Sequence, residues 1–269
     1  MRSTDASPSA AARVDPRFPV TMLQQLKLAF VFLTRLPARP DGPVTMRDLA
    51  GAVHMFPDVG AVVGLLGGVG YTLAGYLGLP SLPGALVALT AMLLATGALH
   101  EDGLADTADA LGAGPNRERA LEIMRDSRIG SYGTIALVMI LLARLVALAS
   151  FWEPLRFTSV LIAASAASRA TMPVVMLIQP SARLTGLAAS TGRPRPRLVA
   201  FGALLALLLC LLLLPWAEAL VAFAAMALVA WLVAGWLGRR FGGCTGDTLG
   251  AVQQTAEIGF LLTVMAHAR

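Results

Sequence analysis

The sequence is poor in charged residues. Asp, Glu, Lys and Arg together make up 14% of its 269 residues, whereas 57% of the residues are hydrophobic. Soluble domains carry about a quarter charged residues. The composition therefore excludes a large soluble core and predicts a polytopic membrane protein.

Cysteine is also scarce. Cys210 lies in a run of Leu, Cys244 lies beside a Gly pair, and no C-x-x-C motif is present. This pattern indicates neither a disulfide framework nor a zinc site. The polar first 17 residues lack the apolar segment of a secretory signal. We expect residues 1–20 to form a disordered tail and residues 21–269 to form a single membrane-embedded domain.

Long apolar runs, by contrast, are abundant. Each is near or above the roughly 20 residues that span a bilayer. They lie at about residues 53–78, 84–100, 133–152, 157–179, 198–214, 216–237 and 248–266. We therefore predict an all-α transmembrane helix bundle of about seven spans. The preceding segment, residues 20–37, is apolar but contains two Gln, a Lys and an Arg, which favours an interfacial or re-entrant helix.

The cations are distributed unevenly between the two sides of this bundle. Of the 21 Lys and Arg residues, 17 lie before the first span or in the loops after the second, fourth and sixth spans. The opposite side has only Arg156 and Arg269, while Arg144 and Arg169 fall inside spans. The positive-inside rule then places the N-terminus and all three long polar loops in the cytoplasm.

One stretch, HEDGLADTADALG (residues 100–112), places carboxylates at an apolar helix end. Asp102, Asp106 and Asp109 are spaced i, i+4, i+7, which puts them within about 60° of each other on a helix, over roughly 10 Å of its axis. Like charges so placed repel, and Mg²⁺ binds carboxylate oxygens together with substrate phosphates. We interpret the three Asp as metal ligands, the alternative being a solvated acidic helix end.

A second polar stretch, RDSRIGSYGT (residues 125–134), precedes the third span. Arg125, Ser127 and Arg128 lie among Gly residues that would allow a ligand to approach the backbone, and Arg binds phosphate through two parallel donors. The alternative is an ordinary basic loop with a Gly turn. Arg169, inside the fourth span, is a candidate either for phosphate binding or for a salt bridge. For Arg144, a structural salt bridge is favoured.

The last span also begins with a carboxylate. Asp247 is either a further metal ligand or the N-cap of this span, and Gln254 shares its helix face. Glu257 lies about ten residues inside the apolar segment, where a carboxylate is costly and commonly functional. Gln254 and Glu257 therefore form a candidate intramembrane polar site, with pairing of Glu257 to Arg144 or Arg169 as the structural alternative.

Together these segments resemble one family. The motifs FLTRLP, HEDGLADTADALG, RDSRIGSYG, SRA and GCTGDTLGAVQQTAEIGFLL are similar to the successive signatures of the cobalamin synthases, or adenosylcobinamide-GDP ribazoletransferases. The resemblance extends from about residue 30 to the last span. The family often has an apolar residue where Glu101 stands and some members have a carboxylate where Gln254 stands, so the resemblance assigns neither residue a metal-binding role.

The resemblance implies a multi-pass enzyme of the bacterial inner membrane whose site faces the cytoplasm. It would join α-ribazole, or its 5′-phosphate, to adenosylcobinamide-GDP and release GMP with Mg²⁺ as cofactor, in the last stage of cobalamin biosynthesis. Asp102, Asp106, Asp109 and Asp247 would be the catalytic and metal-binding residues, and the Arg residues would hold phosphates. The expected partners are the two substrates and the lipid bilayer, with no nucleic acid. The oligomeric state stays open.

Two other functions fit parts of the pattern. CDP-alcohol phosphotransferases of phospholipid synthesis also place an Asp-rich motif at the cytoplasmic end of a membrane helix, but they have DGxxAR where this chain has DGLAD. An ion-coupled transporter would use Asp102, Arg169 and Glu257 as a relay. The polar motifs, however, gather at one face of the membrane, and only Arg169 and Glu257 lie deeper.

Overall fold

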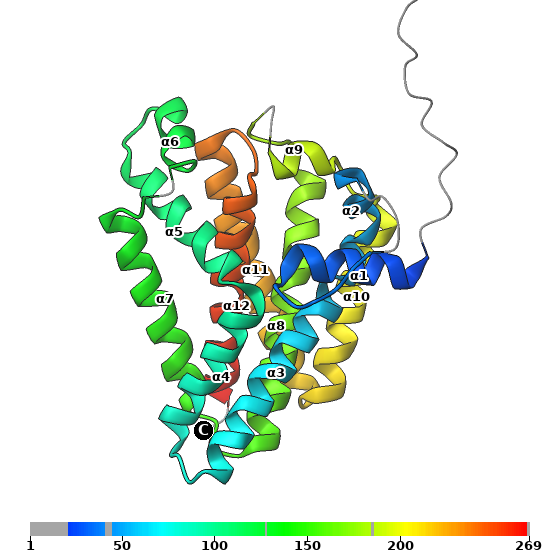
Figure 1. The fold of residues 1–269 in the computed structure, drawn as a ribbon, viewed down its shortest axis with the longest axis vertical. Helices are drawn as coiled ribbons and strands as arrows, with labels where there is room; N and C mark the ends of the chain where they lie inside the picture. The colour runs from blue at the N-terminus through cyan, green and yellow to red at the C-terminus, as the bar shows by residue number, and fades with distance from the viewer. Residues whose placement is uncertain (1–20, 41–44, 127, 184–185, 268–269) are drawn as a thin grey trace, which may run out of the picture.

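A computed structural model describes residues 21–40, 45–126, 128–183 and 186–267, apart from the side chains of Met46, Leu187 and Ala188. The described chain is helical (Figure 1), with one isolated bridge between Ser181 and Cys244. Its helices, in chain order, are α1 (Met22–Leu33), α2 (Met46–Ala52), the short 3₁₀ helix η1 (Val53–Met55), α3 (Phe56–Tyr76), α4 (Ser81–Thr96), α5 (Leu99–Gly112), α6 (Arg117–Ile123), α7 (Ser131–Ala149), α8 (Pro154–Ile178), α9 (Leu187–Thr191), α10 (Pro196–Leu213), α11 (Trp216–Phe241) and α12 (Gly246–His267).

The helix lengths confirm the predicted bundle. Within the described residues, six helical stretches are long and apolar enough to cross a membrane, and the bent pair α4 and α5 makes a seventh. The six are residues 47–76, which include α3, and the helices α7, α8, α10, α11 and α12. At 12 residues, α1 is only about 18 Å long. It lies across the bundle axis (Figure 1), as expected of an interfacial or re-entrant helix.

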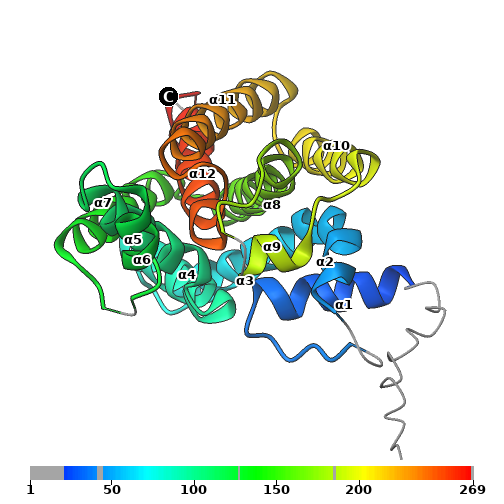
Figure 2. The same ribbon diagram turned by 90° about the horizontal axis from the view of Figure 1, so that it is seen from above.

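The centre of the bundle is α8, which contacts α3, α10, α11 and α12 and lies between them when the bundle is viewed from its end (Figure 2). The Gly residues of α3 allow its backbone to touch that of α8. A Cβ on Gly64 would lie 2.6 Å from the Leu161 carbonyl oxygen, and one on Gly60 would collide with the carbonyl of Ser165. Small residues permit this close approach between membrane helices, so these glycines allow α3 and α8 to pack backbone against backbone.

The second span differs from the sequence expectation of one helix through residue 100. It breaks after Thr96, and α5 departs from α4 at an angle of 86°. Gly97 and Ala98 both have positive φ, 64° and 56°. The left-handed conformation ends α4, and the Arg35 backbone N–H donates to the Ala95 carbonyl at 2.7 Å. The carboxylates of residues 102–109 therefore lie on a separate helix with its own direction.

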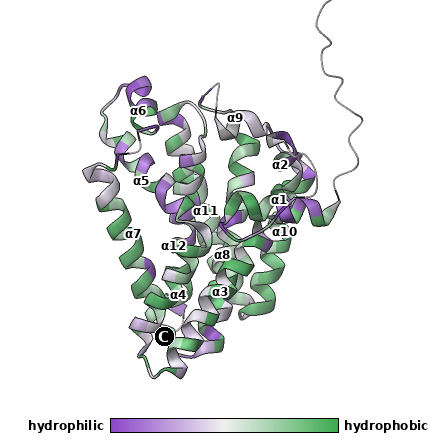
Figure 3. Ribbon diagram, viewed as in Figure 1, coloured by the Kyte–Doolittle hydropathy of each residue, from purple (hydrophilic) through white to green (hydrophobic). Residues whose placement is uncertain are grey.

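One end of the bundle collects the polar segments. Hydrophilic residues gather around α2, α6 and α9, and the C-terminal end of the described chain lies at the opposite end of the bundle (Figure 3). The loops that contain α6 and α9, and the turn from α11 to α12, all lie at this polar end (Figure 1). Alternate loops thus lie on one side, as the partition of cations predicts. We call this side the polar end.

Candidate active site

The carboxylates proposed as metal ligands come together from two helices. α5 carries Asp102, Asp106 and Asp109, and the first turn of α12 carries Asp247. The helices meet at Gly103, where an added Cβ would lie 3.0 Å from the Asp247 Cα. The negative charges of Asp102, Asp247 and Asp109 all act on the half-buried Asp106. The structure therefore brings these four acidic residues into one electrostatic cluster, which we call the acidic site.

The guanidinium group of Arg183, from the loop after α8, lies at the acidic site. Arg183 Nη1 lies 3.4 Å from Asp247 Oδ2, and Arg183 Nη2 donates to the Leu121 carbonyl at 3.2 Å. The charge of Arg183 also acts on Asp106. One guanidinium cannot balance four carboxylates, so the site keeps a negative charge that favours a divalent cation.

The first turn of α12 shows that Asp247 is not its N-cap. The Thr248 backbone N–H donates to Thr245 Oγ1 at 3.1 Å, while Thr248 Oγ1 accepts from the Thr245 backbone N–H at 2.8 Å. This reciprocal pair satisfies the helix start. The N-cap interpretation of Asp247 is therefore wrong, and its carboxylate is directed to Arg183 and the acidic site instead.

Asp109 has a different environment from the other three. Its two carboxylate oxygens accept from the backbone N–H groups of Gly130 and Gly133, at 2.7 and 2.8 Å. These donors belong to the start of α7, where a negative charge is stabilised. A Cβ on Gly130 or Gly133 would collide with the Asp109 carboxylate. The glycines of RIGSYG therefore make room for Asp109, and the α7 N-terminus is already occupied by this side chain.

The acidic residues suit Mg²⁺ better than a cation that needs a complete protein cage. Among the described residues, no group of three or more His, Cys, Asp or Glu side chains is gathered in metal-binding geometry. Mg²⁺ commonly takes one or two carboxylates and completes its shell with water and substrate phosphates. Asp102 and Asp106, which accept no hydrogen bond from the described residues, and Asp247 fit this requirement. Asp109 fits less well because its oxygens hold α7.

The basic loop before α7 is exposed. Arg128 forms a two-pronged contact with Asp126, in which Nη2 and Oδ2 are 2.6 Å apart. The hydrogen bonds from Arg128 lower the pKa of the Asp126 carboxyl to about 2. Arg125 is exposed, and Ser127 lies outside the described residues. Phosphate binding by this loop stays a prediction, with Arg128 held by Asp126 in this structure.

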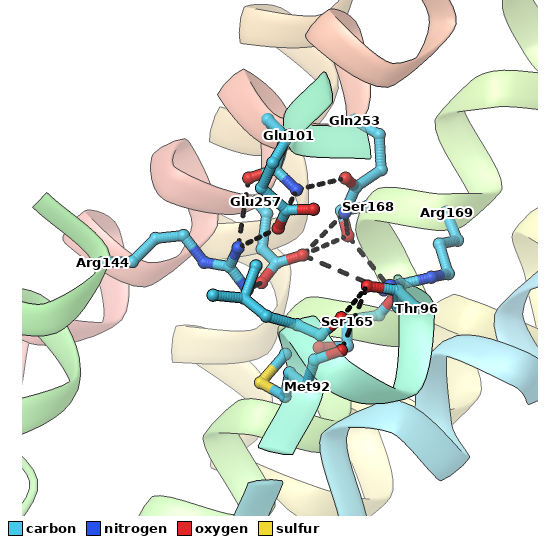
Figure 4. A network of polar contacts seen from close by, with 11 residues as sticks. Met92, Thr96, Glu101, Arg144, Ser165, Ser168, Arg169, Gln253 and Glu257 are labelled. Atoms are coloured by element: carbon cyan, nitrogen blue, oxygen red, sulfur yellow. Dashed lines mark hydrogen bonds and ion pairs between the residues drawn. The ribbon is translucent and has the colours of Figure 1, made fainter. Parts of the chain in front are cut away.

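Deeper in the bundle, the ionisable residues form a second cluster (Figure 4). Arg144 of α7 is 2% exposed. Its Nη1 lies 2.8 Å from Glu101 Oε1, and its Nη2 lies 2.8 Å from Glu257 Oε1. Gln254 Oε1 accepts from Arg144 at 3.1 Å, and its Nε2 donates to Glu101 at 2.9 Å. These residues join α5, α7 and α12. Together with the α8 residues Ser168 and Arg169, they form what we call the buried network.

Arg169 extends this network into α8. Its Nη1 donates to the Ser165 carbonyl at 3.1 Å and lies 3.9 Å from Glu257 Oε2. Ser168 Oγ donates to the same Glu257 oxygen at 3.1 Å (Figure 4). The structural alternative for Glu257 is thus observed, because both Arg144 and Arg169 pair with it. A phosphate-binding role for Arg169 stays a prediction.

Comparison with known proteins places the chain in a family. Residues 25–265 match the profile of the cobalamin-5-phosphate synthases. The chain belongs to this family. It is 44% identical over 245 residues to the adenosylcobinamide-GDP ribazoletransferase of Bradyrhizobium diazoefficiens, covering 91% of this chain and 94% of that protein. The protein of the same name from Azorhizobium caulinodans is 42% identical over 258 residues, 92% of this chain and 97% of the relative. No solved structure matches the chain.

The region that matches the cobalamin-5-phosphate synthases includes a cavity beside the acidic site. The cavity has a volume of about 220 Å³ and lies between α1, α2, α3, α5, α8, α9 and α12. Asp102 and Asp247 line it, together with His100 and Thr191, and most of its other lining residues are apolar. We call it the α5–α12 cavity. It gives the carboxylates an adjoining space that a ligand can enter.

Two residues of the site carry signals that sequence reasoning did not use. Arg183 follows the fourth span by only a few residues, so its proximity to the polar end could have been inferred, but its pairing with Asp247 depends on how the loop folds back. Glu101 stands beside Asp102 in the acidic motif. Successive residues of a helix point in different directions, which sends Glu101 into the buried network and leaves Asp102 exposed.

Proposed function

We propose that this chain transfers a phosphorus-containing group, joining α-ribazole or α-ribazole 5′-phosphate to adenosylcobinamide-GDP and releasing GMP. Family membership and the names of relatives at 42–44% identity support this reaction. The observation that carries it is the convergence of Asp102, Asp106 and Asp247 from two helices beside a cavity. Family membership does not support the phospholipid-synthesis or transporter alternatives.

The reaction requires little covalent work from the protein. A ribose hydroxyl attacks the phosphorus that carries the cobinamide. The bond from this phosphorus to the oxygen that bridges the two phosphorus atoms breaks, and GMP leaves with the bridging oxygen. The hydroxyl proton goes to a carboxylate of the acidic site. Such transfers depend on positioning and on neutralising charge at the phosphates. Bound Mg²⁺ would supply that charge neutralisation, held by one or two carboxylates from among Asp102, Asp106 and Asp247.

The protein's own cations have complementary roles in this proposal. Arg183 lies at the acidic site and would bind a diphosphate oxygen when the substrate displaces its weak contact with Asp247, which is 3.4 Å long. Arg125, Ser127 and Arg128 would reach the substrate from the loop before α7. Arg169 would act from the buried network, below the cavity wall formed by Met172 and Met176.

The chain is proposed to lie in the bacterial inner membrane with the acidic site facing the cytoplasm. The support is the concentration of loop cations at the polar end of the bundle. A reporter fused after Gly114 should behave as cytoplasmic and one fused after Ser81 as external. The reverse result would overturn the orientation while leaving the reaction untouched.

The decisive assay uses purified full-length protein in lipid nanodiscs, both proposed substrates and Mg²⁺. Stoichiometric formation of GMP and the joined cobamide is the expected result, and it should stop with excess chelator. Formation of CMP from a CDP-alcohol, or ion-driven uptake into vesicles without GMP release, would support one of the alternatives instead.

A further inference from the structure

Two of the buried polar side chains that line the α5–α12 cavity have side-chain atoms with no hydrogen-bond partner among the described residues. Both ring nitrogens of His100 lack a hydrogen-bond partner among the described residues, although the side chain is only 2% exposed. Buried polar groups are nearly always hydrogen-bonded, and leaving one unpaired is costly. His100 lines the cavity. A ligand in the cavity would supply the missing partner.

The position of His100 is fixed by its backbone. A Cβ added to Gly250 of α12 would lie 3.0 Å from the His100 carbonyl oxygen and 3.2 Å from its Cα. The residue therefore sits at a close backbone contact of α5 with α12, two residues after the bend at Ala98. Because its backbone is held between the two helices, the imidazole can change its position only by rotation about its own side-chain bonds.

A second unpaired group lines the same cavity from a different helix. Thr191 of α9 is 2% exposed, and its Oγ1 also lacks a partner among the described residues. Two buried orphan groups on α5 and α9 thus border one space. A single unpaired side chain has many explanations, but two facing a common cavity indicate that a ligand with polar atoms belongs there.

The size and lining of the cavity select the kind of ligand. Its volume of about 220 Å³ is below the roughly 300–1,000 Å³ of pockets that hold drug-sized molecules. A corrin macrocycle does not fit, whereas one flat ring system does. The lining includes Phe32, Phe56, Leu49 and Met172. Such a surface suits an apolar aromatic ring with few polar atoms, and suits guanine poorly because guanine has donors and acceptors on several edges.

We infer that the α5–α12 cavity binds the aromatic base of α-ribazole, with His100 donating a hydrogen bond to the unsubstituted ring nitrogen of the base. Thr191 Oγ1 makes a second polar contact with a hydroxyl of the ribose, because the base has no other free acceptor. The ribose then lies toward Asp102 and Asp247, where its hydroxyl meets the phosphate. This inference rests on the proposed function, and it assigns one of the two substrates to a defined part of the site.

The first test measures binding of α-ribazole alone to the purified full-length protein by calorimetry. His100→Phe keeps the ring volume and removes both nitrogens, and Thr191→Val keeps the shape and removes the hydroxyl. Each should weaken α-ribazole binding about tenfold, the loss that corresponds to one hydrogen bond. In steady-state assays the KM for α-ribazole should rise similarly, while kcat and the KM for adenosylcobinamide-GDP change less than about twofold.

Matched controls separate a lost ligand contact from a general disturbance. His54 is also buried with an unpaired Nδ1 but does not line this cavity, so His54→Phe should leave α-ribazole binding unchanged. Thr171 is buried, and its hydroxyl already donates to the Ser168 carbonyl at 2.6 Å. Thr171→Val should likewise leave binding unchanged. Should these controls weaken binding as much as the cavity variants, the assignment is wrong.

The second test changes the ligand instead of the protein. An indole analogue of α-ribazole has C–H in place of the accepting ring nitrogen. It should bind wild-type protein about tenfold more weakly than α-ribazole, yet lose nothing further in His100→Phe. An additional tenfold loss with the indole analogue would show that His100 does not contact that nitrogen.

A third variant keeps the test informative if His100→Phe does not fold. Met172→Trp fills the cavity from α8 and should weaken α-ribazole binding while leaving GMP inhibition unchanged. If GMP or adenosylcobinamide-GDP binding weakens instead, the cavity belongs to the other substrate and the inference fails, although the proposed reaction survives. If wild-type protein forms no GMP from both substrates with Mg²⁺, the proposed function itself fails.

Discussion

The acidic site and the buried network use the same helices but treat charge in opposite ways. Asp102 and Glu101 are neighbours on α5, and Asp247 and Glu257 lie on one helix, α12. In the buried network every carboxylate has a guanidinium partner, with two Arg and two Glu in contact. In the acidic site only Asp247 has a side-chain ion pair among the described residues. We interpret the buried network, where ion pairs balance the charges, as structural. We interpret the acidic site, where most carboxylates beside the cavity have no ion-pair partner in the described part of the chain, as a place for a cation and its substrate.

The largest expected effect is a loss of stability when an ion-pair partner is removed from the buried network. Arg144→Leu leaves Glu101 and Glu257 buried without their main partner, and it should destabilise the protein by about 3–5 kcal/mol. The free energy of unfolding can be measured by titration with SDS in mixed micelles. Combining Arg144→Leu with Glu101→Gln and Glu257→Gln should recover much of this loss of stability. Failure of that rescue would show that charge balance is not what the network supplies.

The next effect is on turnover without loss of stability. Asp102→Asn and Asp247→Asn keep side-chain shape and remove a charge from the acidic site. We expect kcat to fall on the order of 10²–10³-fold, as when one preorganised charge-stabilising group is removed, with partial recovery at raised Mg²⁺. Glu118→Gln, which removes an exposed acidic charge of α6 at the same end of the bundle, is the control. Near-normal turnover in both variants, or activity in excess chelator, would contradict the metal assignment.

A substitution at Asp109 tests whether this carboxylate is structural or binds the metal. Asp109→Asn loses one of two charge-assisted acceptors at the start of α7 and should cost about 1.5–3 kcal/mol of stability. Activity should fall in parallel with the folded fraction and should not respond to raised Mg²⁺. Asp106→Asn serves as the contrast, since it should lose activity at unchanged stability. Recovery of Asp109→Asn by Mg²⁺ would return Asp109 to the metal ligands.

The smallest effects are expected at the proposed phosphate-binding arginines. Arg128→Lys keeps the charge but loses the two-pronged donor set. We expect a lower kcat/KM for the GDP-linked substrate and an unchanged unfolding midpoint, because the side chain is exposed. Arg119→Lys, which alters another exposed ion pair of the same region, is the matched control.

Arg169→Lys should reduce kcat/KM for the GDP-linked substrate together with stability, because Arg169 also contacts Glu257. The two losses can be separated by measuring kinetics well below the unfolding midpoint. Wild-type kinetics in both Arg128→Lys and Arg169→Lys would limit these residues to topology and structural pairing.

The sequence predicts the bundle well because membrane spans leave a strong and local signal. Hydrophobic length and the partition of cations depend on composition, and both are confirmed by the helix bounds and the polar end. The i, i+4, i+7 spacing of Asp102, Asp106 and Asp109 likewise survives, since all three lie on the continuous helix α5.

What the sequence does not reveal depends on contacts between distant segments. The bend before α5 rests partly on Ala98 at φ 56°, a conformation that no residue pattern for Ala predicts. Nothing local distinguishes Asp109, which holds α7, from Asp106, which faces the other carboxylates. The pairing of Arg144 with both Glu101 and Glu257 spans 43 and 113 residues. Only the packing of α5, α7 and α12 decides these roles.

The ion pairs of Arg144 affect how a ligand could reach the α5–α12 cavity. Through its ion pairs with Glu101 and Glu257, Arg144 links α5 and α12, the two helices that form one side of the α5–α12 cavity. The opposite wall is formed by Phe32, Leu33, Leu49 and Thr191, which belong to the short helices α1, α2 and α9. These helices do not share the ion pairs of the buried network. If the cavity binds the base of α-ribazole as inferred above, we therefore expect the nucleoside to enter through this wall, near the polar end of the bundle.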